Sequence, residues 1–109
     1  MTWNKLTDAT QLEQLLAESA TQPVLIFKHS TTCSISAMAL SRLERNWQDT
    51  AGIKPYLLDL LAHRAVSNQI TTLLGVGHQS PQVLLVQGGA CVYDASHMSI
   101  SFRALPQTA

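Results

Sequence analysis

The sequence predicts an α/β fold, in which a central mixed sheet of about four strands is flanked by helices. Segments with apolar residues at helical spacing alternate with short, continuous apolar runs, a pattern typical of parallel strands joined by crossover helices. The Gly88-Gly89 pair predicts a hairpin, which adds an antiparallel strand at one edge. With 109 residues, 46% of them hydrophobic, the chain is expected to form one domain over residues 1–109.

The first half of the chain is expected to form a helix, a strand and a second helix. Leucines at helical spacing predict a helix over residues 8–20, and Pro23 marks its end. A continuous apolar run predicts a strand over residues 24–27 that is buried on both faces. Apolar residues spaced by four then predict a helix that opens at residues 31–34 and ends at Gly52.

The second half adds three strands and two helices. Strands are expected over residues 56–59, 83–86 and 90–93, of which the last two form the hairpin. Helices are expected over residues 63–74 and 98–105. The resulting order is helix, strand, helix, strand, helix, strand, hairpin, strand and helix, and it matches the thioredoxin architecture.

Composition argues against several classes of partner. Seven basic and seven acidic residues cancel, so neither a nucleic acid nor a membrane is expected to bind. No apolar run reaches the roughly 18 residues of a membrane span. The polar N-terminus lacks the apolar stretch of a signal peptide, so we expect a cytoplasmic protein. The cysteines and histidines show no metal-ligand spacing, and no metal site is expected.

Cys33 is the expected catalytic residue. It begins a helix at the carboxyl end of a buried strand, where open α/β sheets place their sites. The unpaired N–H groups and the dipole of a helix N-terminus stabilise a thiolate. A small core cysteine is the alternative, but the neighbours of Cys33 are polar. The residues expected to support the thiolate are Thr32, Ser34 and Ser36, and the preceding Lys28 and His29 could add positive charge.

The Cys33-Ser34-Ile35-Ser36 motif favours monothiol exchange. Ser36 stands where a dithiol oxidoreductase has its second cysteine; it could donate a hydrogen bond to the thiolate but cannot resolve a mixed disulfide. Cys33 would therefore take on one thiol and be released by another from solution. Cys91 is interpreted as an inert thiol in the hairpin strand, with an internal resolving cysteine as the alternative.

Ser80-Pro81 is the second part of the expected site. In a thioredoxin-like fold the proline would be cis and would face the cysteine, although X-Pro bonds in general are seldom cis. His78 could form a polar wall of this edge or merely a structural loop. Arg64 could reach an anionic thiol, since guanidinium suits carboxylates, or could simply be a solvated residue at a helix start.

Residues 29–36 resemble the Thr-Cys-Pro-Ile-Ser region of the monothiol bacilliredoxins, a family of bacillithiol-system redox proteins. The likeness continues in collinear order through most of the chain, at Asp59, His63-Arg64, Ser67-Asn68, Gly75-Val76, residues 78–82 and residues 95–97. The resemblance implies a thioredoxin-like fold, Cys33 as the attacking thiol and Pro81 as the cis-proline. It also implies that His78, Ser80 and Gln82 line one edge. Ser34 replaces the motif proline, and Met98 replaces a frequent tryptophan.

The resemblance implies an enzyme that removes bacillithiol from protein cysteines. Its partners would be S-thiolated proteins and a small thiol, bacillithiol or glutathione-like, that acts as co-substrate. No tightly bound cofactor is expected, and the chain would be a monomer or a weak dimer. The alternative is a non-catalytic thioredoxin-like adaptor that holds a peptide at the Pro81 edge, which consists of His78, Ser80, Pro81 and Arg64.

Overall fold

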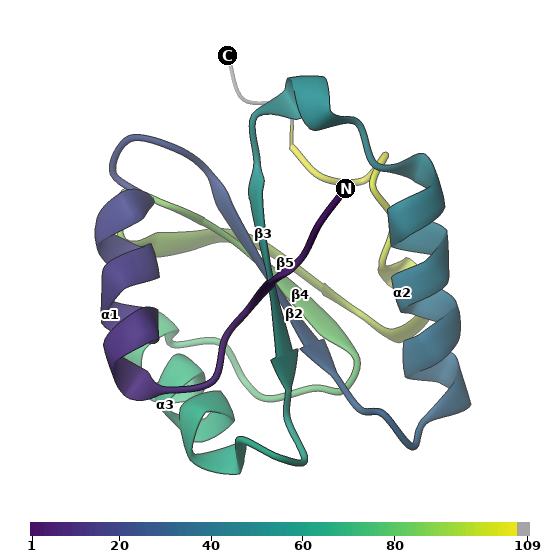
Figure 1. The fold of residues 1–109 in the computed structure, drawn as a ribbon, viewed down its shortest axis with the longest axis horizontal. Helices are drawn as coiled ribbons and strands as arrows, with labels where there is room; N and C mark the ends of the chain where they lie inside the picture. Colours follow the sequence, from purple (N-terminus) through teal and green to yellow (C-terminus); the bar gives the residue numbers. More distant parts are fainter. Residues whose placement is uncertain (107–109) are drawn as a thin grey trace.

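The computed structural model describes residues 1–106 and contains one mixed sheet of five strands (Figure 1). The spatial order is β1-β3-β2-β4-β5. Strands β1 and β2 both run parallel to β3, whereas β4 runs antiparallel to both β2 and β5. The bounds are β1 Asn4–Lys5, β2 Val24–His29, β3 Lys54–Asp59, β4 Gln82–Gln87 and β5 Ala90–Ser96.

The sheet confirms the predicted fold class and adds a strand to it. The continuous apolar runs form β2 and β4, whose side chains are buried on both faces, as expected for central strands. Strand β5 alternates between more and less exposed residues because it lies at an edge. The extra strand, β1, has only two residues and both are exposed, so it lacks the apolar pattern that predicts a strand.

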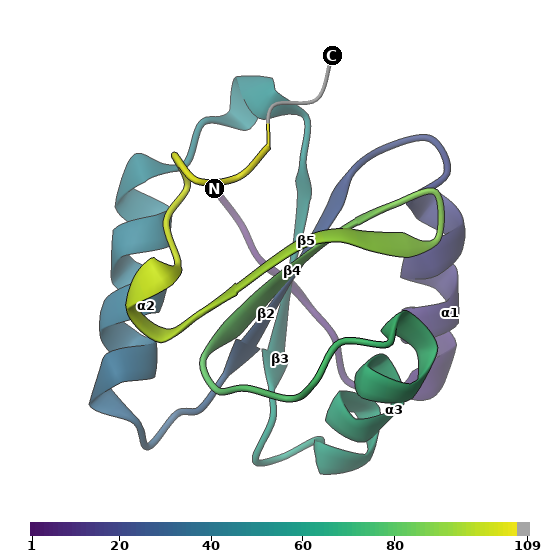
Figure 2. The ribbon, with the colours of Figure 1, turned by 180° about the vertical axis from the view of Figure 1, so that it is seen from behind.

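Helices cover both faces of the sheet (Figures 1 and 2). Helices α1 (Ala9–Glu18) and α3 (Arg64–Leu74) pack on one face, and α2 (Ser34–Asn46) packs on the other together with the segment that follows β5. Each face therefore has its own apolar layer. Leu15, Ile26 and Ile70 belong to the α1–α3 layer, and Phe27 and Leu43 to the α2 layer. Among residues 1–106 no helix is long and apolar enough to cross a membrane.

The second helix is shorter than predicted. It ends at Asn46, and a 3-10 turn over Asp49–Ala51 precedes Gly52, which has a left-handed backbone with φ 71°. Trp47 leaves the helix with an extended backbone, and its ring packs edge-on against Phe102 at a centroid distance of 5.0 Å. This tertiary contact outweighs the helical spacing that had suggested a longer element.

The predicted helix over residues 98–105 is wrong. A 3-10 turn over His97–Ser99 is followed by an extended residue and a second turn. Ile100, Phe102 and Leu105 are buried against the α2 layer. The carbonyl of Ile100 accepts two hydrogen bonds from the guanidinium of Arg42, at 2.7 and 3.2 Å. That carbonyl is thus satisfied by α2, so no helical partner is required.

Candidate active site

Cys33 lies immediately before α2 and is the N-cap residue of that helix. Its backbone N–H donates to the carbonyl of Ser30 at 3.2 Å, and its carbonyl accepts from Ala37 at 3.1 Å. The thiol is partly exposed and makes no capping hydrogen bond. The N–H groups of the first turn therefore have no side-chain partner at this end, and the helix dipole favours negative charge on the sulfur.

The flanking hydroxyls differ in their surroundings. Thr32 and Ser34 are exposed to solvent on either side of Cys33. Ser36 is fully buried. Its Oγ accepts from the N–H of Ser30 at 3.0 Å and lies 2.7 Å from Nδ1 of His29. The expected hydrogen bond from Ser36 to the sulfur is not formed, because the hydroxyl is engaged beneath the helix.

His29 was expected only as a source of positive charge near Cys33, and the structure gives it a closer connection to the site through Ser36. Burial lowers the pKa of its imidazole, while the nearby carboxylates of Asp59 and Glu44 act in the opposite direction. A neutral ring accepts at Nδ1 the proton of the Ser36 hydroxyl, whose oxygen already accepts from Ser30. Strand periodicity offered a signal, since His29 is in phase with Leu25 and Phe27 and so points to the α2 face.

The Ser80-Pro81 peptide bond is cis. Pro81 directly precedes β4, whose first residue, Gln82, pairs with Lys28 of β2. Pro81 is therefore level with the carboxyl end of β2, the same end of the sheet as Cys33. Gln82 is buried and holds the preceding loop, because its side chain donates to the carbonyl of Gly77 at 3.0 Å. Ser80 is only partly buried beside the proline.

His78 and Arg64 lie with a buried lysine on the α3 side of this edge. Lys28 is completely buried, and its Nζ lies 3.3 Å from Nδ1 of His78. Burial lowers the pKa of Lys28. Burial also lowers the pKa of His78, and the charges of Lys28 and Arg64 act in the same direction. Arg64 itself is exposed at the start of α3. The structure thus assigns His78 a contact with Lys28 that the sequence did not suggest.

Cys91 lies at the opposite end of the sheet from Cys33. It pairs with Val86, and Val86 pairs with Val24, the first residue of β2. The six residues of β2 separate these two ends by about 17 Å. The thiol of Cys91 donates to the carbonyl of Tyr93 at 3.3 Å, and burial raises its pKa. This placement favours the inert interpretation of Cys91 over an internal resolving cysteine.

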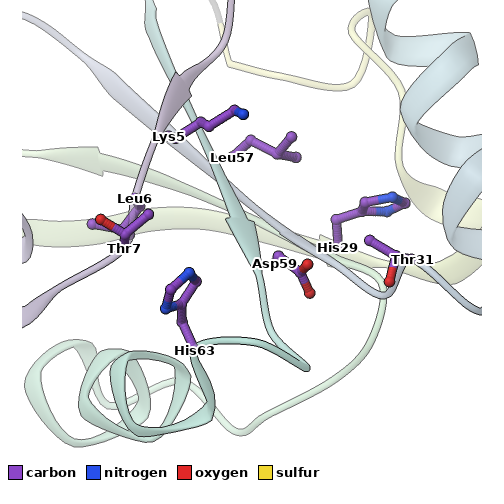
Figure 3. A pocket seen from close by; sticks show the side chains of 8 residues that line it. All are labelled: Lys5, Leu6, Thr7, His29, Thr31, Leu57, Asp59 and His63. Carbon is purple, nitrogen blue, oxygen red and sulfur yellow. The ribbon is translucent and has the colours of Figure 1, made fainter.

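A cavity of about 410 Å³ opens next to the segment that carries Cys33 (Figure 3). It brings together the N-terminal strand, the carboxyl ends of β2 and β3, and the start of α3. It is lined by Lys5, Leu6, Thr7, His29, Thr31, Leu57, Asp59 and His63. None of the residues expected at the Pro81 edge lines it, so Cys33 is flanked by two distinct surfaces.

Comparison with known proteins identifies the family. The model of the family described as monothiol bacilliredoxin BrxC matches residues 4–105. The chain belongs to the monothiol bacilliredoxin family. That match covers both Cys33 and the Pro81 edge, and it agrees with the resemblance found in the motifs around them. This chain is therefore a redox protein that works through a thiol.

Solved structures with a thioredoxin fold resemble this chain. A structure described as a putative oxidoreductase with a thioredoxin fold is 30% identical, with a TM-score of 0.81, and the match covers 92% of this chain and 87% of that one. Thioredoxin from Malassezia sympodialis is 13% identical, with a TM-score of 0.71 and coverage of 88% and 79%. Thioredoxin from Fasciola hepatica is 14% identical, with a TM-score of 0.72 and coverage of 86% of both chains. The two thioredoxins show a shared fold.

Proposed function

We propose that the protein is a monothiol thiol-disulfide oxidoreductase that removes a low-molecular-weight thiol, such as bacillithiol, from mixed disulfides on proteins. The observation that carries the proposal is the isolation of Cys33. This thiol lies at an uncapped helix start, Ser36 occupies the position one turn further on, and Cys91 is at the far end of the sheet. Such a thiol can exchange disulfides but depends on an external thiol for release.

The reaction needs no group beyond two thiols and a disulfide. The Cys33 thiolate attacks the small-thiol sulfur of the mixed disulfide, and a new S–S bond forms as the old one breaks. The protein sulfur leaves with the electron pair and takes a proton from water, so the protein cysteine is reduced and Cys33 is oxidised. A second small thiolate then attacks the adduct. It forms a disulfide between the two small thiols and restores the Cys33 thiolate.

The protein half of the substrate is proposed to lie along the Pro81 edge. Ser80 and Pro81 are level with the carboxyl end of β2; Pro81 is buried, and Ser80 is partly exposed at this edge. Thr32 and Ser34 flank the sulfur with exposed hydroxyls that can hydrogen-bond the leaving thiolate. Arg64 and His78 are proposed to complete the edge. The partners are S-thiolated proteins and the free small thiol, without a tightly bound cofactor, and the proposed location is the cytoplasm.

Mass spectrometry of the intact protein tests this function. The wild-type chain is mixed with a bacillithiolated protein, and the expected products are the free protein thiol and one bacillithiol adduct on Cys33. Cys91→Ala should behave like the wild type, and Cys33→Ala should release no protein thiol. An adduct of equal yield in Cys33→Ala contradicts the proposal.

A second readout separates this enzyme from the non-catalytic adaptor. The rate at which iodoacetamide alkylates Cys33 at pH 7 is compared with the rate for free cysteine. Because only the thiolate reacts, an activated Cys33 is expected to react faster. A rate no higher than that of free cysteine, together with no adduct, supports the adaptor.

A further inference from the structure

The cavity beside Cys33 has an ordered arrangement of charges that the proposed exchange step does not use. Strand register defines this order. Lys5 of β1 is paired with Leu57 of β3, and Asp59 of β3 is paired with His29 of β2. Leu57 and Asp59 are two residues apart on one strand, so they share the α2 face and lie about 7 Å apart. From the sheet edge toward Cys33 the order is Lys5, Leu57, Asp59 and His29 (Figure 3).

The ammonium of Lys5 and the carboxylate of Asp59 can each bind a charged group of a ligand. Among residues 1–106, no ion pair joins the exposed ammonium of Lys5 to a carboxylate. Asp59 uses Oδ1 to accept from the N–H groups of Leu61 and Ala62, at 3.2 and 3.3 Å. Its second oxygen, Oδ2, has no hydrogen-bond partner within the described part of the chain. The cavity therefore offers a cation at its far end and a carboxylate at the end nearer Cys33.

The remaining walls suit a compact polar molecule with an apolar face. Leu57 forms an apolar surface between the two charges, and Leu6 adds to it. His63, at the start of α3, and Thr31, two residues before Cys33, supply ring nitrogens and a hydroxyl at the rim. In Figure 3, Asp59 lies between His63 on one side and His29 with Thr31 on the other.

We propose that this cavity binds the small-thiol half of the mixed disulfide and selects a thiol that has a free amine near its sulfur and a carboxylate at its far end. The inference rests on the proposed function. Asp59 receives the amine, Lys5 pairs with the carboxylate, and the intervening part of the ligand packs on Leu57. Bacillithiol has this order of groups, since its cysteinyl amine is free and its malate is distal. In glutathione the cysteinyl nitrogen is in an amide bond, so that charge is absent.

The direct test is a binding titration with a ligand that cannot react at Cys33. S-methyl bacillithiol is added to the full chain, and backbone NMR shifts of Leu57, Asp59 and Thr31 are followed. We expect these shifts to move together, with a dissociation constant about fivefold to tenfold weaker in Lys5→Gln and in Asp59→Asn. Asp59→Asn keeps an acceptor oxygen for the Leu61 and Ala62 amides, so it removes the charge without removing the turn. Arg45→Gln, in the last turn of α2, is the matched control and should bind normally.

Two further ligands test the order of charges. N-acetylation of S-methyl bacillithiol should weaken binding to the wild type by a similar factor and leave binding to Asp59→Asn nearly unchanged, because both changes remove the same contact. S-methylglutathione should bind the wild type more weakly than S-methyl bacillithiol. If Lys5→Gln and Asp59→Asn bind S-methyl bacillithiol as tightly as the wild type does, or if the shifts are confined to Ser80 and its neighbours, the inference is overturned.

The outcomes separate this inference from the proposed function. If Cys33 accepts bacillithiol from a protein but the thioether does not move the cavity resonances, the binding inference fails and the exchange reaction stands. If the thioether binds with the expected charge dependence but no adduct ever forms on Cys33, the reaction fails and the cavity remains a binding site for an amine-bearing carboxylate.

Discussion

The imidazole Nδ1 of His29 and the hydroxyl of Ser36 lie 2.7 Å apart beneath the first turn of α2. The same hydroxyl accepts from the N–H of Ser30. Ser36 thus ties the end of β2 and the following loop to the helix that begins after Cys33. The serine of the Cys-x-x-Ser motif positions the reactive segment through the backbone and does not bond to the sulfur.

Replacing Ser36 by alanine is expected to destabilise the fold by about 1–3 kcal/mol, because the buried N–H of Ser30 loses its acceptor. Ser67 is the matched control, since it is also a buried helical serine but its hydroxyl has no partner within residues 1–106. Ser67→Ala should be neutral or stabilising by about 1 kcal/mol. Urea denaturation measures both free energies of unfolding. Equal losses in the two variants would show that the Ser36 hydrogen bonds contribute nothing specific.

Replacing Lys28 by methionine is expected to raise the free energy of unfolding at pH 7 by on the order of 1 kcal/mol. The reason is that a fully buried ammonium is disfavoured, and its hydrogen-bond partner within residues 1–106, His78, offers no negative charge. The pKa of Lys28 is lowered in the folded state, so the unfolded chain binds more protons between the two pKa values. The penalty is complete below the folded pKa and vanishes above the unfolded value of about 10.4.

Urea denaturation of wild type and Lys28→Met at pH 7 and pH 10 checks this prediction. The advantage of the methionine variant should shrink at pH 10. A variant that is less stable than wild type at both pH values would mean that the Lys28–His78 contact outweighs the cost of burial.

Stability is expected to fall as the pH drops from 7.5 to 5. Burial lowers the pKa of His29, so its contribution is present above the unfolded value of about 6.5 and is lost as the pH falls through the folded value. The slope for one proton is at most about 1.4 kcal/mol per pH unit. His29→Asn keeps a polar atom near the position of Nδ1 and should reduce the slope. The pKa of His78 is also lowered, so His78 is expected to account for part of the pH dependence of stability that is left in His29→Asn.

Truncating Phe102 to alanine is expected to destabilise the fold by about 3–5 kcal/mol, as a large buried ring is lost. Phe102 packs on Trp47, which in turn packs on Trp3 at a centroid distance of 6.1 Å. Arg103→Ala changes the next residue, which is exposed, and should cost at most about 0.5 kcal/mol. Thermal denaturation measures the loss of stability in Phe102→Ala and in Arg103→Ala. A small effect of Phe102→Ala would show that the C-terminal segment is not part of the cooperative core.

The central elements were predictable because their signals are local. Continuous apolar runs marked β2 and β4, helical spacing marked α1 and α3, and the glycine pair marked the hairpin. The position of Cys33 at a helix start followed from the same signals. The motif resemblance supplied the expectation of a cis bond before Pro81, which no local propensity favours.

The features that the sequence did not predict depend on contacts between residues that are far apart in the chain. Lys5 belongs to a strand only because it pairs with Leu57. The segment after His97 does not continue as a helix because Arg42 satisfies the Ile100 carbonyl. His29 joins the site through Ser36 and Asp59, and no single window of sequence contains all of these partners.

The short strand β1, which carries Lys5, makes one side of the cavity easy to detach from the sheet. The pairing of Asn4 with Tyr56 closes a loop of about 50 residues, and the entropy of that closure is offset by few contacts. The N–H of Leu6 donates to the carbonyl of Leu57 at 2.9 Å, and the amide of Asn4 donates to the carbonyl of Pro55 at 3.1 Å. Such a short edge is expected to detach before the central strands open. A ligand that bridges Lys5 and Asp59 would fasten the first residues of the chain to the sheet, so occupancy could be followed by slower hydrogen exchange at the Leu6 amide.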